Sequence, residues 1–186
     1  MSEKLSINAA IDYLTNEQVI AYPTESIFGL GCDPDSEKAV KQLLDLKKRD
    51  ISKGLILIAD KYQRLLPYID DNNLSAEQKM AIFQSWPGHI TWIMPKNNDT
   101  PYFLTGQFDT IAVRVTAHPL VRALCSLYGK PIVSTSANLS GQAPCKTSEQ
   151  VQQQFGQYFP ILQGKIGNQN KPSQIRDSRN GNIIRY

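Results

Sequence analysis

The sequence predicts a single α+β domain in which a mixed β-sheet is flanked by helices in α/β-type layers. Short apolar runs, typical of strands, interleave irregularly with segments whose apolar residues recur at three and four, typical of helices. This order favours a mixed sheet over a strictly parallel, doubly wound one. The 186 residues, 41% of them hydrophobic, show no break in composition, so one domain over residues 1–186 is expected.

Five segments carry helical periodicity or capping residues. They are expected at 7–14, at 36–46 with Ser36 as N-cap, at 75–86 with a Ser75–Gln78 capping box, between Pro119 and Gly129, and after a Thr147–Gln150 capping box. The second helix should turn one apolar face inward. That face consists of Ala39, Val40, Leu43, Leu44 and Leu46.

Strands are expected where apolar runs stand between turn signals. They lie at 18–22, 55–59, 90–94, 110–115 and 131–135, followed by a hairpin over 173–186 that turns at Asn180-Gly181. The first strand runs into Pro23-Thr24, and the chain returns through Gly29 and Gly31. We interpret these two glycines as turn residues in preference to a site of close ligand approach.

Composition excludes several classes of protein. No apolar run approaches the roughly 18 residues that span a bilayer, and the N-terminus lacks the regions of a signal peptide, so a cytoplasmic protein without membrane contact is expected. Cys32, Cys125 and Cys145 show no CxxC spacing and are expected to be reduced thiols. His89 and His118 have no metal-ligand spacing, so no protein-bound metal and no histidine-based triad are expected.

Charge is unevenly distributed along the chain. The first 40 residues carry two lysines against seven acidic residues, whereas residues 161–186 carry five basic residues against Asp177 alone. An anionic partner near the C-terminal strands and a merely solvated basic surface both fit this asymmetry. Another basic cluster, Lys47, Lys48, Arg49 and Lys53, either complements the helix dipole or binds a ligand at the rim of the sheet.

Two further places combine polar groups with apolar strands. Arg114 interrupts the apolar run 110–115, which indicates either a half-exposed strand face or a carboxylate-binding site. The stretch STSANLSG, Ser134 to Gly141, places hydroxyl and amide groups directly after an apolar strand. Such groups need partners when they lie near a core, and either loop backbone or a ligand would supply them.

Together these motifs resemble the YrdC family. AYPTESIFGLG, LKKRDISKGLILIA, TIAVRVTAHPL, PIVSTSANLSG and the closing IIRY occur in the family's order over nearly the whole chain. The resemblance implies a twisted mixed sheet with helices around a concave basic groove. It also implies a nucleotidyltransferase that joins L-threonine, bicarbonate and ATP into threonylcarbamoyl-AMP and pyrophosphate, for modification of the adenosine beside the anticodon of tRNA.

The resemblance also implies roles for individual residues. The family's KxR and SxN pairs fall on Lys47 and Arg49 and on Ser136 and Asn138, which are expected to be catalytic and to bind ATP. Residues expected to hold threonine are Thr24, Lys53, Arg114 and Ser173, and further residues expected near ATP are Thr110, Ser134 and Arg185. Lys53 stands where many longer relatives have a histidine.

The implied partners follow from the same resemblance. ATP is expected as a substrate with Mg²⁺ bridging its phosphates, and the proteins TsaD, TsaB and TsaE are expected to carry out the transfer to tRNA. An alternative is a double-stranded RNA-binding or ribosome maturation factor that uses the same basic groove, whose affinity would fall steeply with salt and ignore ATP and threonine. The clustering of charges and hydroxyls at several strand ends argues against a purely structural role.

Overall fold

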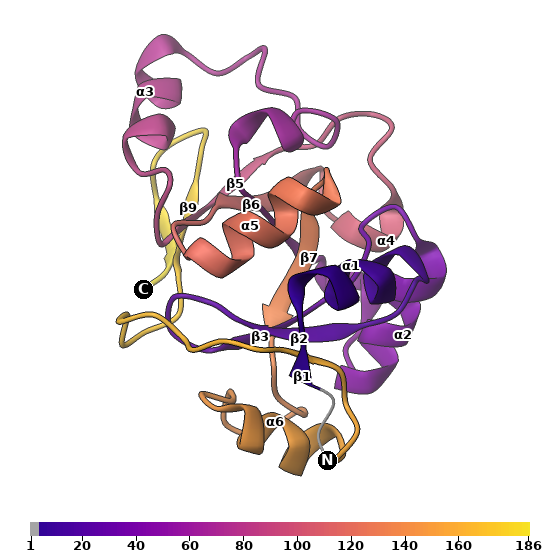
Figure 1. Ribbon diagram of the computed structural model, residues 1–186. Helices are drawn as coiled ribbons and strands as arrows, with labels where there is room; N and C mark the ends of the chain where they lie inside the picture. Colours follow the sequence, from indigo (N-terminus) through magenta and orange to yellow (C-terminus); the bar gives the residue numbers. More distant parts are fainter. Residues whose placement is uncertain (1–3) are drawn as a thin grey trace.

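The apolar runs pair into one twisted sheet, described for residues 4–186 by a computed structural model (Figure 1). The strand order across it is β1-β8-β2-β3-β7-β4-β6-β5-β9-β10. The pairs β1–β8, β2–β8, β4–β6 and β5–β9 are parallel and the others are antiparallel, which confirms the predicted mixed sheet. The strands are β1 (Lys4–Leu5), β2 (Ile20–Pro23), β3 (Phe28–Gly31), β4 (Ile56–Ala59), β5 (Ile90–Pro95), β6 (Thr110–Val115), β7 (Ile132–Ser136), β8 (Ile161–Leu162), β9 (Gln174–Asp177) and β10 (Ile183–Arg185).

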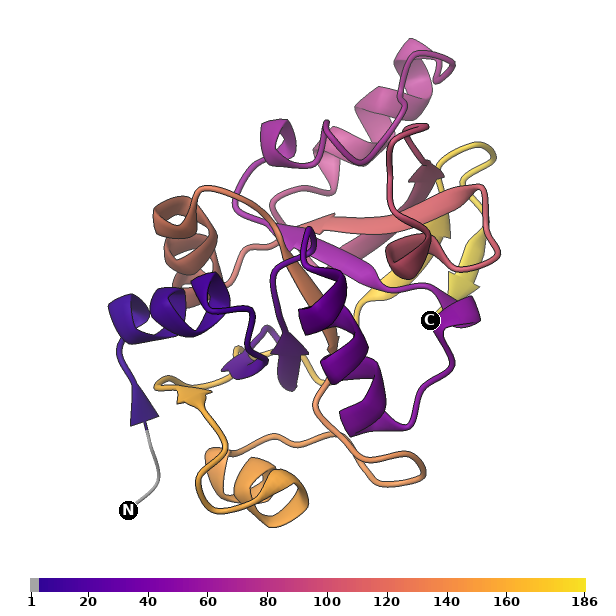
Figure 2. The same ribbon diagram turned by 90° about the vertical axis from the view of Figure 1, so that its right-hand side faces the viewer.

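Helices cover both faces of this sheet (Figures 1 and 2). They are α1 (Ile7–Thr15), α2 (Glu37–Lys47), η1 (Ile51–Lys53), η2 (Tyr62–Arg64), α3 (Ala76–Gln84), α4 (Tyr102–Thr105), α5 (Pro119–Tyr128) and α6 (Ser148–Phe155). The helices α1 and α5 lie side by side on one face, where they pack on Ile20, Tyr22 and Ile132. The inward face of α2 packs against the opposite face of the sheet, on Leu57 and Val133. The chain therefore has a core on each side of its sheet.

The predicted helix ends are confirmed except at the end of α3, and one of the two predicted capping boxes is incomplete. Ser36 caps α2, the Ser75–Gln78 box opens α3 and Gly129 ends α5, while α3 stops two residues before the expected Trp86. Thr147 caps α6 by accepting from Gln150 N. The reciprocal bond of a capping box is absent there, because the Gln150 side chain accepts from the N–H of Lys146 instead.

The interpretation of Gly29 and Gly31 as turn residues is wrong. Both lie in β3, which is paired between β2 and β7, and neither has a positive φ. A Cβ on Gly31 would lie 2.3 Å from the carbonyl oxygen of Val133 and 2.6 Å from the Tyr22 ring, and one on Gly29 would lie 3.2 Å from that ring. These glycines make room for the buried Tyr22, which is a packing requirement that a single sequence does not display.

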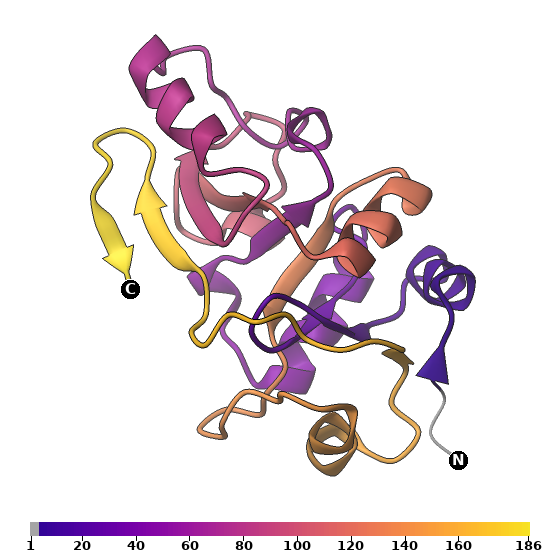
Figure 3. The same cartoon turned by 60° about the vertical axis from the view of Figure 1, so that its left-hand side comes forward.

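The C-terminal hairpin extends one edge of the sheet beyond β5 (Figure 3). Its strand β9 runs parallel to β5, and β10 returns antiparallel to β9 through the predicted Asn180-Gly181 turn, with Gly181 at φ 73°. The return carries Arg185 back beside Ser173, to which its guanidinium donates a hydrogen bond. Within residues 4–186 no helix is long and apolar enough to cross a membrane.

Candidate active site

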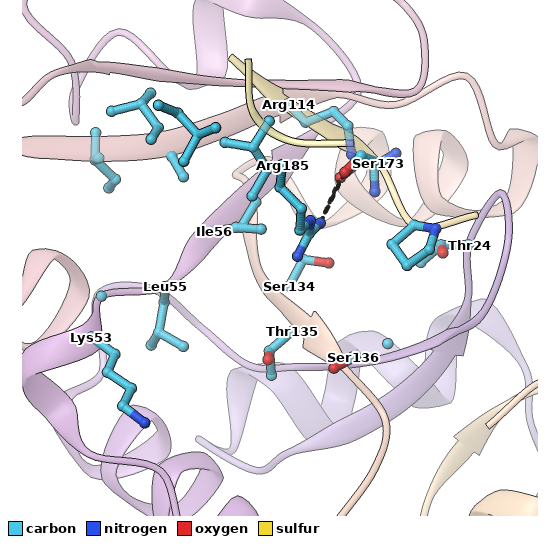
Figure 4. Close-up of a pocket in the computed structure, with 18 of the residues that line it drawn as sticks. Thr24, Lys53, Leu55, Ile56, Arg114, Ser134, Thr135, Ser136, Ser173 and Arg185 are labelled. Atoms are coloured by element: carbon cyan, nitrogen blue, oxygen red, sulfur yellow. Dashed lines mark hydrogen bonds between the residues drawn. The ribbon is translucent and has the colours of Figure 1, made fainter. Parts of the chain in front are cut away.

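A cavity of about 490 Å³ opens where the central strands end, and most of the predicted site residues line it (Figure 4). Its walls come from β3, β4, β6, β7 and the hairpin, with η1 and α4 at one side. The predicted residues that line it are Thr24, Arg49, Lys53, Thr110, Arg114, Ser134, Ser136, Ser173 and Arg185. Lys47 and Asn138 are not in this lining. The sheet thus gathers residues from five separate segments of the sequence.

Arg49 enters the cavity wall because of the way α2 ends. The residue after the helix, Lys48, adopts a left-handed conformation with φ 50° and caps the last turn. Nη2 of Arg49 then donates to the carbonyl oxygen of Gly54 at 3.0 Å, and its buried Nε has no hydrogen-bond partner within residues 4–186. Burial lowers the pKa of Arg49, yet a guanidinium stays charged at neutral pH. The fold therefore presents a half-buried positive charge to the cavity.

Three cations of this cavity have no carboxylate partner. None of the ion pairs formed by residues 4–186 includes Arg49, Lys53 or Arg185. Burial, and the charge of the nearby Arg114, lower the pKa of Arg185. Cations kept together without a counter-charge favour an anionic ligand, because desolvated charge is costly until it is paired.

Lys47 and Asn138 lie behind the cavity wall, where they fix the loop that follows β7. The Lys47 ammonium donates to the carbonyl oxygens of Ser136 and Asn138, and the Asn138 amide donates to Leu139 O and Gln142 O at 3.0 and 3.1 Å. Ser136 Oγ donates to Asn138 Oδ1 at 2.6 Å. The polar stretch is thus satisfied largely by its own loop, and it leaves Ser134, Thr135 and Ser136 facing the cavity. Burial and the neighbouring Arg49 lower the Lys47 pKa to about 8.

Arg114 is buried, so the half-exposed strand face considered for it is wrong. Its side chain contacts the loop after β2, where Nη1 is 2.7 Å from Oε2 of Glu25. Arg114 is 5% exposed and Glu25 is 7% exposed, so the pair is largely removed from water. Thr116 Oγ1 and the N–H of Ala117 donate to the other carboxylate oxygen, at 2.6 and 3.1 Å. Burial opposes the charged form of Glu25, but Arg114 and these hydrogen bonds hold its pKa down at about 2.

Ser173 closes the same end of the cavity. Its hydroxyl lies 2.8 Å from Thr91 Oγ1, and its carbonyl oxygen accepts from Arg185 Nη2 at 2.9 Å (Figure 4). Nε2 of His89 lies 2.7 Å from the carbonyl oxygen of Lys171; because a carbonyl accepts, Nε2 carries the proton. Burial lowers the pKa of His89, which favours its neutral form. Two side chains from the start of β5 therefore hold the segment that leads into Ser173.

Three residues at this end were not predicted from the sequence. Glu25, Thr91 and His89 lie in the loop after β2 and around the start of β5. Glu25 is an acidic residue between Thr24 and Ser26, which could have drawn attention to it, but its partner Arg114 is distant in the sequence. Thr91 lies within an apolar run and does not stand out in the sequence. The spacing of His89 bears only on metal binding and does not indicate its hydrogen bond to Lys171.

The residues of the cavity do not fit a metal held by the protein. No carboxylate lines it, and no three His, Cys, Asp or Glu side chains of residues 4–186 gather in a way that would hold an ion. Mg²⁺ prefers oxygen ligands, one or two of them carboxylates when protein supplies them. The cavity lining therefore offers Mg²⁺ no such carboxylate.

Comparison of the sequence with known proteins identifies close relatives. The chain is 58% identical to threonylcarbamoyl-AMP synthase of Photorhabdus laumondii over 180 residues, which are 97% of this chain and 95% of that protein. It is 57% identical to threonylcarbamoyl-AMP synthase of Escherichia coli with the same two coverages. These relatives match along nearly their whole length.

Solved structures and a family model agree with these relatives. The fold matches Sua5 of P. abyssi complexed with L-threonine, with a TM-score of 0.84, 30% identity and coverage of 92% of this chain and 50% of Sua5. The chain thus spans about half of Sua5. YciO of E. coli shares the fold with a TM-score of 0.82, 23% identity and coverage of 96% and 87%. The Sua5/YciO/YrdC family model, described as "Telomere recombination", matches residues 12–186. With the model covering nearly all of the chain and relatives above half identity, the protein belongs to the Sua5/YciO/YrdC family.

Proposed function

We propose that the protein is a threonylcarbamoyl-AMP synthase that makes L-threonylcarbamoyladenylate and pyrophosphate from L-threonine, bicarbonate and ATP. The observation that carries the proposal is the division of one cavity into two unlike ends. One end gathers the unpaired cations Arg49 and Lys53. The other end holds Arg114 paired with Glu25, beside Ser173 and Arg185 (Figure 4). Polyphosphate suits the first end and an amino acid suits the second.

The reaction needs positioning and charge neutralisation more than covalent help from the protein. The threonine nitrogen bonds to the carbon of bicarbonate-derived CO₂, loses a proton and becomes a carbamate. A carbamate oxygen then attacks the α-phosphorus, the bond from that phosphorus to the bridging oxygen breaks, and pyrophosphate leaves. Fixed cations stabilise the charge that gathers on the phosphates, and alignment of carbamate and ATP lowers the entropic barrier.

The residues divide these tasks by position. Arg49 and Lys53 neutralise phosphate charge, and Arg185 adds positive charge from beside Ser173. Thr110, Ser134 and Ser136 offer hydroxyls along the cavity wall. Lys47 and Asn138 support this wall from behind by holding the loop that carries Ser136.

Arg114, Thr24 and Ser173 form the threonine end. Arg114 receives the threonine carboxylate. The Thr24 hydroxyl donates to the carbonyl oxygen of Ile27 at 2.8 Å, so it offers only lone pairs to a ligand. Glu25 is ionised at neutral pH and its contacts are filled by neighbours, so we assign it no role as a base.

The wider setting follows from the same proposal. The product would supply the threonylcarbamoyl group for adenosine in tRNA, with TsaD, TsaB and TsaE acting in the transfer, and all of this would take place in the cytoplasm. The alternative of a double-stranded RNA-binding or ribosome maturation factor is not favoured, since the relatives above are named as synthases.

Incubation of the purified protein with ATP, bicarbonate and threonine tests the proposal. Mass spectrometry should detect the threonylcarbamoyl adenylate, and pyrophosphate release should require threonine and bicarbonate together, because ATP alone meets no competent nucleophile. Equal pyrophosphate release without threonine would identify a plain ATPase and refute the assignment.

A further inference from the structure

Arg185 lies at the threonine end of the cavity, on the side that faces the wall proposed for ATP. Its Nη2 donates to the carbonyl oxygen of Ser173 at 2.9 Å and lies 3.5 Å from the Ser173 hydroxyl oxygen. In Figure 4 the guanidinium lies between Ser173, which belongs to the threonine end, and Ser134, which belongs to the ATP wall. A cationic side chain therefore stands where the two proposed substrate regions meet.

The charge of Arg185 is available to a ligand. Within residues 4–186 this side chain forms no ion pair, and neither its Nε nor its Nη1 takes part in a hydrogen bond. Burial, and then the charge of the nearby Arg114, lower the pKa of Arg185. A guanidinium nevertheless stays charged, and its N–H donors share one plane, so it can contact two anionic groups at once.

The proposed reaction brings two anions together at this point. The carbamate formed on threonine must place an oxygen within bonding distance of the α-phosphorus, although both groups are negatively charged. Repulsion between anions a few ångströms apart is strong in a site partly removed from water. Arg114 is already balanced by Glu25, and Lys53 lies on the far side of the cavity from Ser173 (Figure 4). Arg185 is therefore well placed to offset this repulsion.

We propose that Arg185 couples the binding of the two substrates by bridging the anionic group of threonine held at Arg114 and the α-phosphate of ATP. The inference rests on the proposed function and deepens it. In this position Arg185 does more than add affinity for one ligand, because it offsets a repulsion that exists only when both ligands are bound. Its contribution is a coupling free energy between the two binding sites, which is reciprocal by linkage.

The test is the dissociation constant of threonine, measured by calorimetry in bicarbonate buffer with and without saturating α,β-methylene-ATP, an analogue that cannot release pyrophosphate. With the wild-type protein, the analogue should leave the Kd of threonine unchanged or lower it. With Arg185→Ala, the analogue should raise this Kd about tenfold, within the usual range of coupling between sites. Arg185→Lys keeps the charge but not the planar fork, so the analogue should raise its Kd by less than in Arg185→Ala.

Arg179→Ala is the matched control. Arg179 lies in the turn of the same hairpin, pairs with Asp177 and is absent from the cavity lining. Its replacement removes an arginine and loosens the hairpin but leaves Arg185 in place. The analogue should affect the Kd of threonine as it does in the wild type. A tenfold rise in this variant too would trace the effect to a loosened hairpin and overturn the proposal.

The measurement also separates coupling from simpler roles of Arg185. If Arg185 contacted phosphate alone, Arg185→Ala would weaken analogue binding by the same factor with and without threonine. If it only supported Ser173, threonine binding would weaken by the same factor with and without the analogue. Either pattern would contradict the proposal.

The proposal does not depend on one variant. Arg185 lies on the edge strand β10 and belongs to neither core, so Arg185→Ala should fold. A wild-type protein in which the analogue itself raises the Kd of threonine tenfold would refute the bridge without any variant. Failure of the proposed function has a different signature, namely that the wild type forms no adenylate in the mass-spectrometric assay.

Discussion

Arg49→Ala removes one cation from the phosphate end and leaves the sheet untouched. The guanidinium makes one hydrogen bond, to Gly54 O, and no ion pair within residues 4–186. Its larger role in our proposal is toward developing phosphate charge, where loss of one preorganised donor costs about 2.7–4 kcal/mol, or about 10²- to 10³-fold in kcat. Loss of the single bond to Gly54 should lower stability by about 1 kcal/mol.

Two measurements separate these effects. Pyrophosphate release with saturating substrates gives kcat, and thermal unfolding gives Tm, which should fall by only about 2–4 °C for a chain of this size. Arg49→Lys should lie between alanine and the wild type, because lysine keeps the charge and loses the planar fork. Lys41→Ala is the control, since Lys41 lies on α2, the helix that precedes Arg49, is exposed and within residues 4–186 forms an ion pair only with Glu37. A fully active Arg49→Ala protein, or an unfolded one, would refute the reasoning.

Three further outcomes are expected. Serine, which lacks one methyl group, should react with a kcat/KM about 10 to 200 times below that of threonine, and valine should be rejected more strongly if the site hydrogen-bonds the hydroxyl; steady-state rates with the three amino acids decide this. The pKa of Glu25 is about 2 in the folded protein, against an ordinary 4.5. Ionised Glu25 therefore contributes its full share to the free energy of unfolding above pH 4.5, and this contribution is lost as the pH falls toward the lower, folded-state pKa. Between about pH 6 and about pH 3, the free energy of unfolding measured in urea should fall by about 2 kcal/mol more for the wild type than for Glu25→Gln. Gly31→Ala should lower the free energy of unfolding by about 3 kcal/mol and Gly29→Ala by about 1 kcal/mol. The reason is that a Cβ on Gly31 would meet the backbone of Val133, whereas one on Gly29 would meet only the Tyr22 side chain. Chemical unfolding measures both values, and equal losses of stability would contradict this account of β3.

Periodicity and turn chemistry predicted most of the fold. The central strands are apolar runs long enough to stand out, and the hairpin is set by Asn180-Gly181, whose glycine has the positive φ that such turns require. The strand β3 was missed because its sequence is FGLG, in which glycine removes the usual β signal. Its glycines leave room for the ring of Tyr22 on the neighbouring strand β2. Such a contact between strands leaves no local pattern in the sequence. The two-residue strands β1 and β8 are too short to carry any periodicity.

The candidate site was predicted by motif and not by geometry. The resemblance to the YrdC family led to Arg49, Arg114 and Ser173, and the cavity contains all three. Their surroundings were not predictable, because Arg114 is paired with Glu25, which comes from the loop after β2, far away in the sequence. Local alternation along β6 could not distinguish a buried arginine with a partner from a half-exposed one. Long-range electrostatic pairing is therefore the information that the single sequence lacked.

The distribution of buried charge indicates where this fold gives up stability for binding. Replacing a buried ion pair by packed apolar residues is often neutral or stabilising, so Arg114 and Glu25 are not required to hold the sheet together. The ammonium of Lys47 is also buried, at a cost that appears as its lowered pKa. These charges lie in or directly behind the wall of one cavity, while the cores that pack on α1, α2 and α5 are apolar. Charges that were placed for stability would be spread over the surface in compensated pairs, as Lys41 and Glu37 are. Arg49, Lys53 and Arg185, which line the cavity without a carboxylate partner among residues 4–186, instead favour an anionic ligand, and in our proposal the polyphosphate of ATP supplies the missing negative charge.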